Sequence, residues 1–416
     1  MIVSTKLKIS SSGFFLFLSL IGATWTLPVS HDAAQLAPTA SAQADWRCVS
    51  VSTTGQYQTA GTSFYGIYTS SDYGATWTIA DRPLYDGLWY SVGMSSDSDG
   101  KDQTAVDASG GIYTSSNYGA TWTMALPLTE IWGSVSLSSS GSFQFAVSHY
   151  GRSTFSSGGV ITYSSDYGKT WRITGAPLAL WRSVSVASDG PNRTAVSHDG
   201  IYTADDESGN YWTRRSTPAA SDYWESVSLS STGRYQTAVI ADYGGGEICT
   251  SSDYGATWKV AAAPSAFWQS VSLSSTGQYQ TAVASDDDAG GIYRSSDSGA
   301  TWTIALNLQQ YWESVSLSST GQYQTAVVYG GGIYISSDYG AKWRAVNLMT
   351  SLPTMARHAS GPSPLSLKLQ VGDDMINATA AEQLSMSLSK SQDIFEREAR
   401  RQAAESQAKK QLAARG

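Results

Sequence analysis

Histidine is scarce in this chain, and two of its four copies lie in short polar segments close to other side chains that can do chemistry. Imidazole, guanidinium and carboxylate groups together can bind a charged ligand or transfer a proton. The alternative is a solvated loop face on which these groups share no pocket. The candidate ligand-binding residues are His149, Arg152, Arg182, His198, Asp199 and Glu225.

Catalysis and metal binding find weaker support in the sequence. Glu225 and Glu313 occupy the same position in two copies of a repeat, and a glycoside hydrolase needs two carboxylates across a cleft. Nothing beyond that shared position connects the pair, so no catalytic residue is assigned. The acidic run 286–288 offers oxygen ligands for Ca²⁺, but the spacing of an EF-hand loop is absent. We therefore expect no metal and no cofactor.

The elements that position these residues follow from the tryptophans, which form two interleaved series. Steps in the first series are 43, 43, 49, 43, 44 and 44 residues. A period of about 40–45 residues with several short strands per unit is typical of a β-propeller, so seven copies predict seven blades. The first series is Trp46, Trp89, Trp132, Trp181, Trp224, Trp268 and Trp312, and the second is Trp77, Trp122, Trp171, Trp212, Trp258, Trp302 and Trp343.

Each copy contains four predicted strands, as residues 312–346 show with the sequence WESVSLSSTGQYQTAVVYGGGIYISSDYGAKWRAV. Strand A is W-x-S-V-S-L-S, strand B is Q-Y-Q-T-A-V, strand C is G-I-Y-x-S and strand D is A-T-W-T-x-A. The tryptophans on strands A and D are expected to pack between blades rather than to stack on sugars. The predicted fold is all-β, a seven-bladed propeller of four-stranded antiparallel blades.

A recurring S-x-D-x-G-x-T-W motif separates strands C and D. Its aspartate is expected to accept hydrogen bonds from backbone N–H groups two residues on, and its glycine to supply an unusual φ. Asn117 replaces the aspartate in one copy, Lys342 replaces the threonine in another, and the copy at 203–212 is stretched. The turn residues assigned this structural role are Asp72, Asn117, Asp166, Asp253, Asp297 and Asp338.

This motif resembles the Asp-box, or BNR repeat, of sialidases, other glycoside hydrolases, sortilin-like receptors and photosystem II assembly factors. The resemblance covers about 300 residues and implies a propeller fold, with the Asp-boxes lying away from any active site. A sialidase would be six-bladed and carry an Arg-Ile-Pro motif, which is absent here. The photosystem II assembly factors match better in blade number and imply a protein-binding role, but they present an arginine-rich patch that this chain lacks.

The two faces of the predicted propeller differ in how strongly their sequences vary. The A–B and C–D turns are near copies of one another, whereas the B–C and D–A loops change from blade to blade. A uniform scaffold carrying one variable face is typical of a protein with an individual binding site there. The residue after each strand-A tryptophan also varies and is expected to ring the channel mouth, as Arg47, Tyr90, Gly133, Arg182, Glu225, Gln269 and Glu313.

Charge narrows the class of partner. Residues 45–347 contain 15 basic and 26 acidic residues, a net charge of −11. Nucleic-acid-binding domains normally present a basic face, so no nucleic-acid partner is expected. The predicted function is a non-catalytic binding or scaffold module for a protein or a glycan. An Asp-box glycoside hydrolase and a photosystem II assembly-like chaperone are the alternatives, and the oligomeric state is not predicted.

The chain divides into four predicted segments. Residues 1–44 carry an apolar run and Ala-Gln-Ala at 42–44, which indicates a signal segment and an exported protein with no membrane span in its mature form. Residues 45–350 form the propeller, 351–372 a linker, and 373–416 a polar tail that is helical or disordered. Cys48 and Cys249 fall in distant blades, so no intramolecular disulfide is expected.

Overall fold

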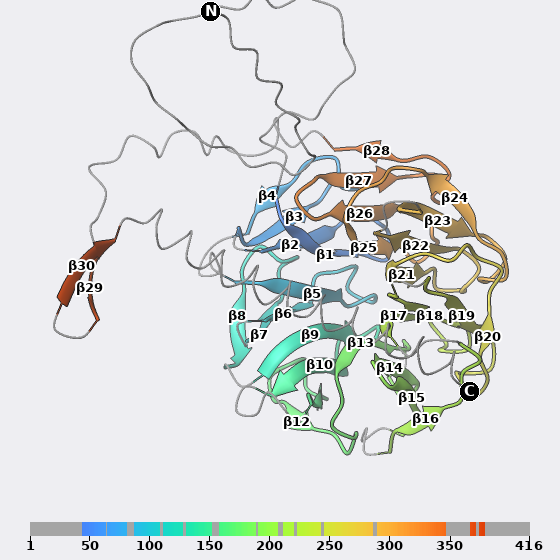
Figure 1. Ribbon diagram of the computed structural model, residues 1–416, viewed down its shortest axis with the longest axis horizontal. Coiled ribbons are helices and arrows are strands. Elements are labelled where there is room, and N and C mark those ends of the chain that lie inside the picture. The colour runs from blue at the N-terminus through green and yellow to red at the C-terminus, as the bar shows by residue number, and fades with distance from the viewer. Residues whose placement is uncertain are drawn as a thin grey trace, which may run out of the picture. The chain divides into compact units, whose positions relative to one another are not determined.

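The computed structural model describes residues 44–346 except 64, 81–86, 109–110, 128–129, 152–157, 189, 207–210, 220–222, 243–244 and 286–288, together with 367–371 and 374–378. Between Trp46 and Ala345 the chain forms seven four-stranded antiparallel sheets, each built from consecutive strands. They are arranged as blades around a common centre (Figure 1). The predicted seven-bladed propeller is confirmed, and the described residues contain no helix.

The strands of each blade run from the innermost to the outermost. Blades 1 to 3 contain β1 Trp46–Val51, β2 Gln58–Thr62, β3 Ile67–Ser70 and β4 Thr78–Ile79; β5 Trp89–Met94, β6 Gln103–Asp107, β7 Ile112–Ser115 and β8 Thr123–Leu126; β9 Glu130–Leu137, β10 Gln144–Gly151, β11 Ile161–Ser164 and β12 Arg172–Ile173. Blades 4 and 5 contain β13 Trp181–Val186, β14 Arg193–Ser197, β15 Gly200–Ala204 and β16 Thr213–Arg215; β17 Trp224–Leu229, β18 Gln236–Ile240, β19 Ile248–Ser251 and β20 Lys259–Val260.

Blades 6 and 7 contain β21 Trp268–Leu273, β22 Gln280–Ala284, β23 Gly291–Ser295 and β24 Thr303–Leu306; β25 Trp312–Leu317, β26 Gln324–Val328, β27 Ile333–Ser336 and β28 Arg344–Ala345. A separate hairpin joins β29 Leu367–Val371 to β30 Asp374–Ala378, across the predicted boundary between linker and tail. The rest of both segments lies outside the described residues, as does the predicted signal segment up to residue 43. No helix among the described residues is long and apolar enough to cross a membrane.

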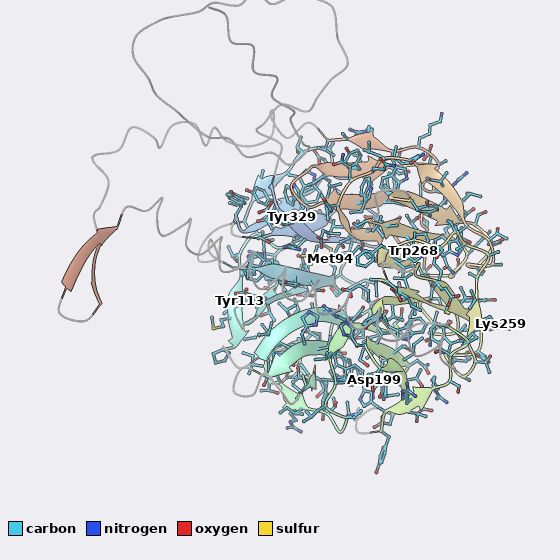
Figure 2. The ribbon with its side chains drawn as sticks, viewed as in Figure 1. Met94, Tyr113, Asp199, Lys259, Trp268 and Tyr329 are labelled. Carbon is cyan, nitrogen blue, oxygen red and sulfur yellow. The ribbon has the colours of Figure 1, made fainter. Side chains whose placement is uncertain are left out.

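The core is divided into seven apolar clusters, one at each junction between neighbouring blades. The strand-A tryptophans are fully buried in them. Trp268 of blade 6, labelled in Figure 2, packs with Val239 and Ile248 of blade 5. Each large ring thus removes apolar surface of two blades from water, which is the largest favourable contribution to joining them. The predicted packing role of these tryptophans is confirmed.

Serine hydroxyls connect the innermost strands of neighbouring blades. These strands are the edges of separate sheets, so each has N–H groups that its own sheet leaves unpaired. At six of the seven junctions a valine N–H donates to a serine Oγ of the preceding blade, as from Val184 to Ser134 at 3.3 Å. At the junction of blades 1 and 2, Cys48 replaces the serine. In strand A the apolar residues therefore pack in the core, while the alternating serines accept hydrogen bonds from the edge of the neighbouring sheet.

A second ring of buried hydrogen bonds joins the second strands. Thr59 Oγ1 donates to Gln103 Oε1 of the next blade at 2.8 Å, and the same threonine–glutamine pair recurs at five other junctions. One of these pairs, Thr325 and Gln58, connects blade 7 to blade 1 at 2.7 Å. Blade 7 and blade 1 each keep all four of their own strands, so the ring closes through contacts of the same kind as at other junctions.

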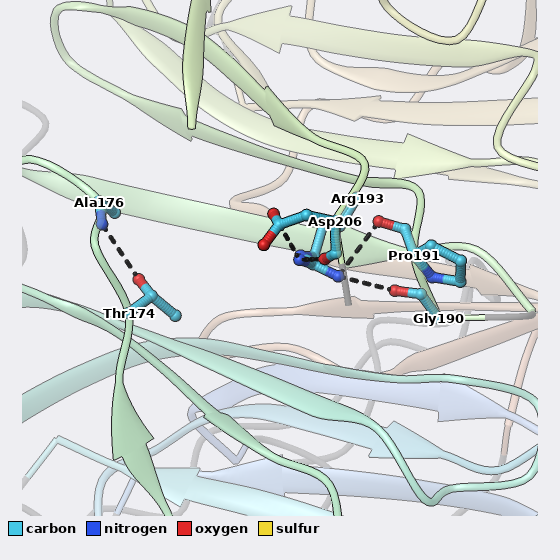
Figure 3. A network of polar contacts seen from close by, with 6 residues as sticks. All are labelled: Thr174, Ala176, Gly190, Pro191, Arg193 and Asp206. Atoms are coloured by element: carbon cyan, nitrogen blue, oxygen red, sulfur yellow. Dashed lines mark hydrogen bonds and ion pairs between the residues drawn. The ribbon is translucent and has the colours of Figure 1, made fainter. Parts of the chain in front are cut away.

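The junction of blades 3 and 4 is the exception to this ring. Phe145 replaces the threonine and Arg193 replaces the glutamine, and the guanidinium lies 4.5 Å from the centre of the phenylalanine ring. Arg193 donates to the carbonyl of Gly190, as each glutamine does to the equivalent glycine, and pairs with Asp206 at 3.3 Å (Figure 3). Burial, partly opposed by the nearby acidic residues, lowers the pKa of Arg193 to about 10. The two substitutions thus replace one inter-blade contact with another.

The turns between strands C and D differ in detail from the prediction. Asp72 Oδ1 accepts from the N–H of Thr76, four residues on, and from Ser70 Oγ, while its Oδ2 accepts from Thr76 Oγ1 at 2.6 Å. The aspartate therefore spans the whole turn instead of binding two residues ahead. Positive φ falls on Tyr73 (62°) as well as on Gly74 (78°), so glycine alone does not supply it. Asn117 keeps the same acceptor role toward the N–H of Thr121.

Both cysteines are buried free thiols, Cys48 in blade 1 and Cys249 in blade 5. The expected absence of a disulfide between them agrees with this placement. Burial raises the pKa of each thiol to about 12. Thiolate is the reactive form, so neither residue is a nucleophile at neutral pH.

Candidate functional site at the mouth ring

Every blade carries a β-bulge at the same place, the residue after the strand-A tryptophan. The bulge lies where the innermost strand begins, at the end of the propeller that carries the B–C and D–A loops. We call this end the loop face, and the opposite end, with the A–B and C–D turns, the turn face. A bulge redirects a side chain out of the regular alternation of a strand. The seven bulged residues form what we call the mouth ring: Arg47, Tyr90, Gly133, Arg182, Glu225, Gln269 and Glu313.

One half of the mouth ring is built around Arg182 of blade 4. Its Nε donates to Nε2 of His198 at 2.8 Å and lies 3.6 Å from Oε2 of Glu225 in blade 5. His198 in turn makes an edge contact with Tyr223, with ring centres 5.6 Å apart. The arginine therefore connects a histidine of its own blade to a carboxylate of the next. These are three of the six residues that the sequence singled out.

His149 lies beside this group and is held inside the fold. Its Nδ1 is 2.5 Å from the carbonyl oxygen of Trp181, and its ring meets Tyr90 edge-on at 6.2 Å. A Cβ added to Gly133 would lie 2.5 Å from the imidazole, so the glycine leaves the space that the ring occupies. Burial and the charge of Arg182, partly opposed by the bond to Trp181, lower the pKa of His149 to about 3. The imidazole is therefore neutral and donates from Nδ1 at physiological pH.

Asp199 is turned toward its own blade and not toward Arg182. Its carboxylate accepts hydrogen bonds from the hydroxyl groups of Ser197 and Tyr202, and its backbone oxygen accepts from Arg214. Figure 2 labels Asp199 on blade 4. Both carboxylate oxygens therefore accept hydrogen bonds within the hairpin formed by β14 and β15. Arg152 lies outside the described residues.

The other half of the mouth ring is built around Arg47 and was not among the six candidates. Arg47 Nη1 lies 3.2 Å from Oε1 of Glu313 in blade 7, and its Nε donates to Ser63 Oγ at 3.0 Å. The guanidinium also lies 4.3 Å from the ring centre of Tyr329, a cation–π contact. Arg47 and Glu313 could have been identified from the sequence, because each directly follows a strand-A tryptophan. Nothing in the repeat pattern pointed to Tyr329.

Electrostatics connect the two halves. Burial raises the pKa of Glu313 to about 7, an effect that Arg47 opposes and the negative charge of Glu225 reinforces. Burial likewise raises the pKa of Asp45, against the influence of Arg47. The mouth ring thus holds two arginine–glutamate pairs among aromatic rings, with one carboxyl near the middle of its titration at neutral pH. No group of three His, Cys, Asp or Glu side chains arranged to hold a metal occurs in the described part of the chain.

Comparison of the sequence with protein-family models finds no match, and comparison with curated proteins finds none either. The fold is similar to that of several solved structures. YCF48 bound to D1 peptide has a TM-score of 0.53 and 14% identity, over 71% of this chain and 94% of that chain. YCF48 from Cyanidioschyzon merolae has a TM-score of 0.51 and 15% identity, over 71% of this chain and 96% of that chain.

The third structure, an ancestral GH74 enzyme, has a TM-score of 0.58 and 13% identity over 81% of this chain. The match spans only 49% of the enzyme, about half its length. WD40 propellers such as that of RRP9 are similar too, with a TM-score of 0.53 at 10% identity. At these identities the likeness shows the propeller fold alone.

Proposed function

We propose that this protein is a non-catalytic binding module that holds an extended segment of a partner protein over the mouth ring. The observation that carries the proposal is the bulge repeated in all seven blades. The same backbone device places seven residues of five different types at one end of the propeller, while the surrounding strands are near copies. A scaffold that is uniform except at one ring of side chains is suited to a single, specific ligand.

The chemistry of the mouth ring favours a polypeptide. Arg47 and Arg182 are planar donors already oriented by Glu313 and Glu225, so a carboxylate of the ligand can exchange for a ring carboxylate without moving the guanidinium. Tyr329 is 37% exposed and adds an aromatic surface beside them. Aromatic and arginine side chains are the residues most enriched where proteins bind proteins. The acidic domain as a whole disfavours a nucleic acid.

The structural neighbours include a peptide-binding propeller, which supports the binding proposal, and an enzyme, which keeps catalysis as the alternative. One of them is YCF48 with a bound D1 peptide, a propeller of similar size that binds a peptide. A photosystem II assembly-like role is a narrower form of the same proposal, and the lack of an arginine-rich patch speaks against that narrower form. The turns built on Asp72 and its equivalents support membership of the Asp-box propellers, and the apolar run before residue 44 supports export.

A glycoside hydrolase is the second candidate, and one observation favours it. The pKa of Glu313 is raised to about 7, the direction that a general acid requires, and Glu225 is the second carboxylate. Each glutamate is paired with an arginine, an arrangement that also serves binding. The test is hydrolysis of a panel of chromogenic glycosides by the wild type and by Glu313→Gln. Activity that the variant loses while keeping its fold would establish a glycoside hydrolase. Equal activity in the two proteins would rule out Glu313 as the general acid.

The binding proposal is tested by selecting a phage-displayed random peptide library on the full-length chain. The retained peptides should lose affinity about tenfold or more for the Arg47→Gln/Arg182→Gln variant, because both oriented donors are gone. Arg234→Gln, an exposed arginine on the turn face, is the matched control and should bind normally. Arg182→Glu/Glu225→Arg keeps an ion pair while moving its charges and should also lose binding, and circular dichroism of each variant checks that the fold is retained. Equal binding by all four proteins would overturn the proposal.

A further inference from the structure

Most C–D turns on the turn face carry a tyrosine that the turn itself does not require. Six C–D turns place the residue after the motif's aspartate or asparagine at φ between 60° and 64°, and in five of them that residue is tyrosine. Bulky residues rarely adopt this left-handed conformation, because the side chain approaches the backbone. The five tyrosines are Tyr73, Tyr118, Tyr167, Tyr254 and Tyr339.

The sixth turn shows that tyrosine is not needed to make it. Ser298 has φ 61° and donates its N–H to the carbonyl of Gln278, as each tyrosine does to its own A–B turn. Asp297 of the same turn accepts from the N–H and hydroxyl of Thr301 in the usual way. The turn therefore closes equally well around a small side chain, and the tyrosine rings have some other purpose.

Three of the rings have a structural purpose. Tyr118, Tyr73 and Tyr339 lie 4.1, 4.5 and 4.6 Å from a tyrosine in the A–B turn of the preceding blade. Those partners are Tyr57, Tyr323 and Tyr279. The first pair is stacked and the other two are tilted, and all three stabilise the junction between blades and offset the backbone strain.

Tyr167 and Tyr254 have no such partner. The preceding blades carry Asp102 and Asn192 where Tyr57 stands in blade 1, and in the described part of the chain neither ring meets another aromatic ring. Tyr167 and Tyr254 are also the most exposed of the five tyrosines, at 54% and 50% against 40% for Tyr73 and 38% for Tyr339, while Tyr118 is partly buried. Two strained residues thus present bare aromatic surface to solvent, which points to a partner outside the chain.

The surroundings of the two rings supply hydroxyl groups and one basic side chain each: Lys169 in the turn of Tyr167, and Arg234, whose carbonyl accepts the N–H of Tyr254. The carboxylates of Asp166 and Asp253 are occupied by hydroxyl and N–H donors of their own turns, so they cannot engage a ligand without opening the turn. Ser140, Ser142 and Thr232 place hydroxyl groups on the adjoining A–B turns. The acidic domain repels polyanions, including nucleic acids and sulfated glycans.

We propose that the turn face binds a neutral polysaccharide, with sugar rings stacked on Tyr167 and Tyr254. A polymer fits because the two platforms are the same residue in the same turn of blades 3 and 5, and a ligand of repeating units can engage both. Two weak contacts on one chain then add to a useful affinity. This site is separate from the mouth ring and from the protein partner proposed for it.

The test is affinity gel electrophoresis of the full-length chain in gels containing hydroxyethyl cellulose, xylan, galactomannan or soluble starch. At least one polymer should retard the wild type, and Tyr167→Ser/Tyr254→Ser should weaken that binding about tenfold or more. Serine is the matched replacement, since Ser298 occupies the same backbone conformation in blade 6. Tyr311→Ser, a 69% exposed tyrosine on the loop face, should be retarded like the wild type.

Three results would overturn this proposal. They are free migration of the wild type in all four gels, undiminished retardation of the double variant, and retardation only in a fifth gel that contains dextran sulfate, a polyanion. None of them bears on the peptide binding assigned to the mouth ring, because Tyr167 and Tyr254 lie on the turn face.

Discussion

Two titratable groups of the candidate site respond to pH in opposite directions. Glu313 has a folded-state pKa of about 7 against a usual value of 4.5, so the folded protein binds that proton more tightly. Its contribution to stability is complete below the usual pKa and is lost as pH rises toward 7. His149, lowered to about 3 from 6.5, behaves in the reverse sense: stability falls as pH drops through that interval, because only the unfolded chain takes up the proton.

Glu313→Gln isolates the first effect. Between pH 4.5 and 7 the free energy of unfolding of the wild type should fall relative to that of the variant, because only the wild type must ionise a buried carboxyl. Denaturant unfolding at several pH values measures the difference, and His149 cancels since it is present in both proteins. Arg47 stays charged throughout and adds a constant offset. Parallel stability curves would show that Glu313 titrates normally.

At the scale of the element, the C–D turn depends on one carboxylate with three donors. Burial would raise the pKa of Asp72, but the hydrogen bonds from Thr76 and Ser70 outweigh it and hold the pKa below its usual value. Asn117 shows that an amide serves nearly as well, since its Oδ1 accepts from Thr121 N and its Nδ2 donates to Thr121 Oγ1. The oxygen acceptor matters more than the charge.

Asp72→Asn should therefore cost less than about 1 kcal/mol of unfolding free energy, whereas Asp72→Ala should cost about 1–3 kcal/mol by leaving the N–H of Thr76 without its acceptor. Urea denaturation of the two variants gives both values. The account of the turn fails if the asparagine variant is as unstable as the alanine variant.

The junction of blades 3 and 4 offers a paired test. Phe145→Thr/Arg193→Gln restores the contact found at the other junctions, so the double variant should be about as stable as the wild type. Each single change should destabilise more, because Phe145→Thr removes the ring 4.5 Å from a buried guanidinium, and Arg193→Gln places an amide against that ring with no threonine hydroxyl to bind. A double-mutant cycle from thermal unfolding measures the coupling. Additive losses would mean that the two substitutions are independent.

The ring as a whole closes without a shared strand, and this has a measurable consequence. Gln58 joins blade 7 to blade 1, and Gln280 joins blade 5 to blade 6 through the same threonine hydrogen bond. Gln58→Leu and Gln280→Leu should destabilise by similar amounts, about 1–3 kcal/mol each. Guanidinium unfolding of both variants tests the equivalence. A far larger loss for Gln58→Leu would show that closure is a special, weaker junction.

The architecture could be predicted from the sequence alone because every blade repeats the same pattern of residues. The spacing of Trp46, Trp89 and their equivalents gave the number of blades, and the alternation in strand A gave its buried face. The site was harder, because its contacts cross blades. Arg47 contacts Tyr329 where blades 1 and 7 meet, although the two residues are far apart in the sequence. The carboxylate of Asp199 accepts hydrogen bonds from hydroxyl groups of its own hairpin. The repeat pattern of the sequence predicts neither of these contacts.

The turns show a second limit. Steric rules assign positive φ to glycine, so Gly74 was expected to carry it and Tyr73 was not. The ring of Tyr73 packs against Tyr323 of the neighbouring blade with ring centres 4.5 Å apart, a contact visible only once the blades are in register. Phe145 and Arg193 likewise look like two unrelated departures from the repeat until the junction brings them together.

The central claim is that the mouth ring is where a partner polypeptide binds, and hydrogen–deuterium exchange of the full-length chain with a library-selected peptide tests it most directly. The account predicts slowed exchange at the bulged residues, such as Arg47, Arg182 and Glu313, and in the neighbouring B–C loops, with unchanged exchange in the C–D turns around Asp72 and Asp253. Protection confined to the turn face or the outer strands would contradict it.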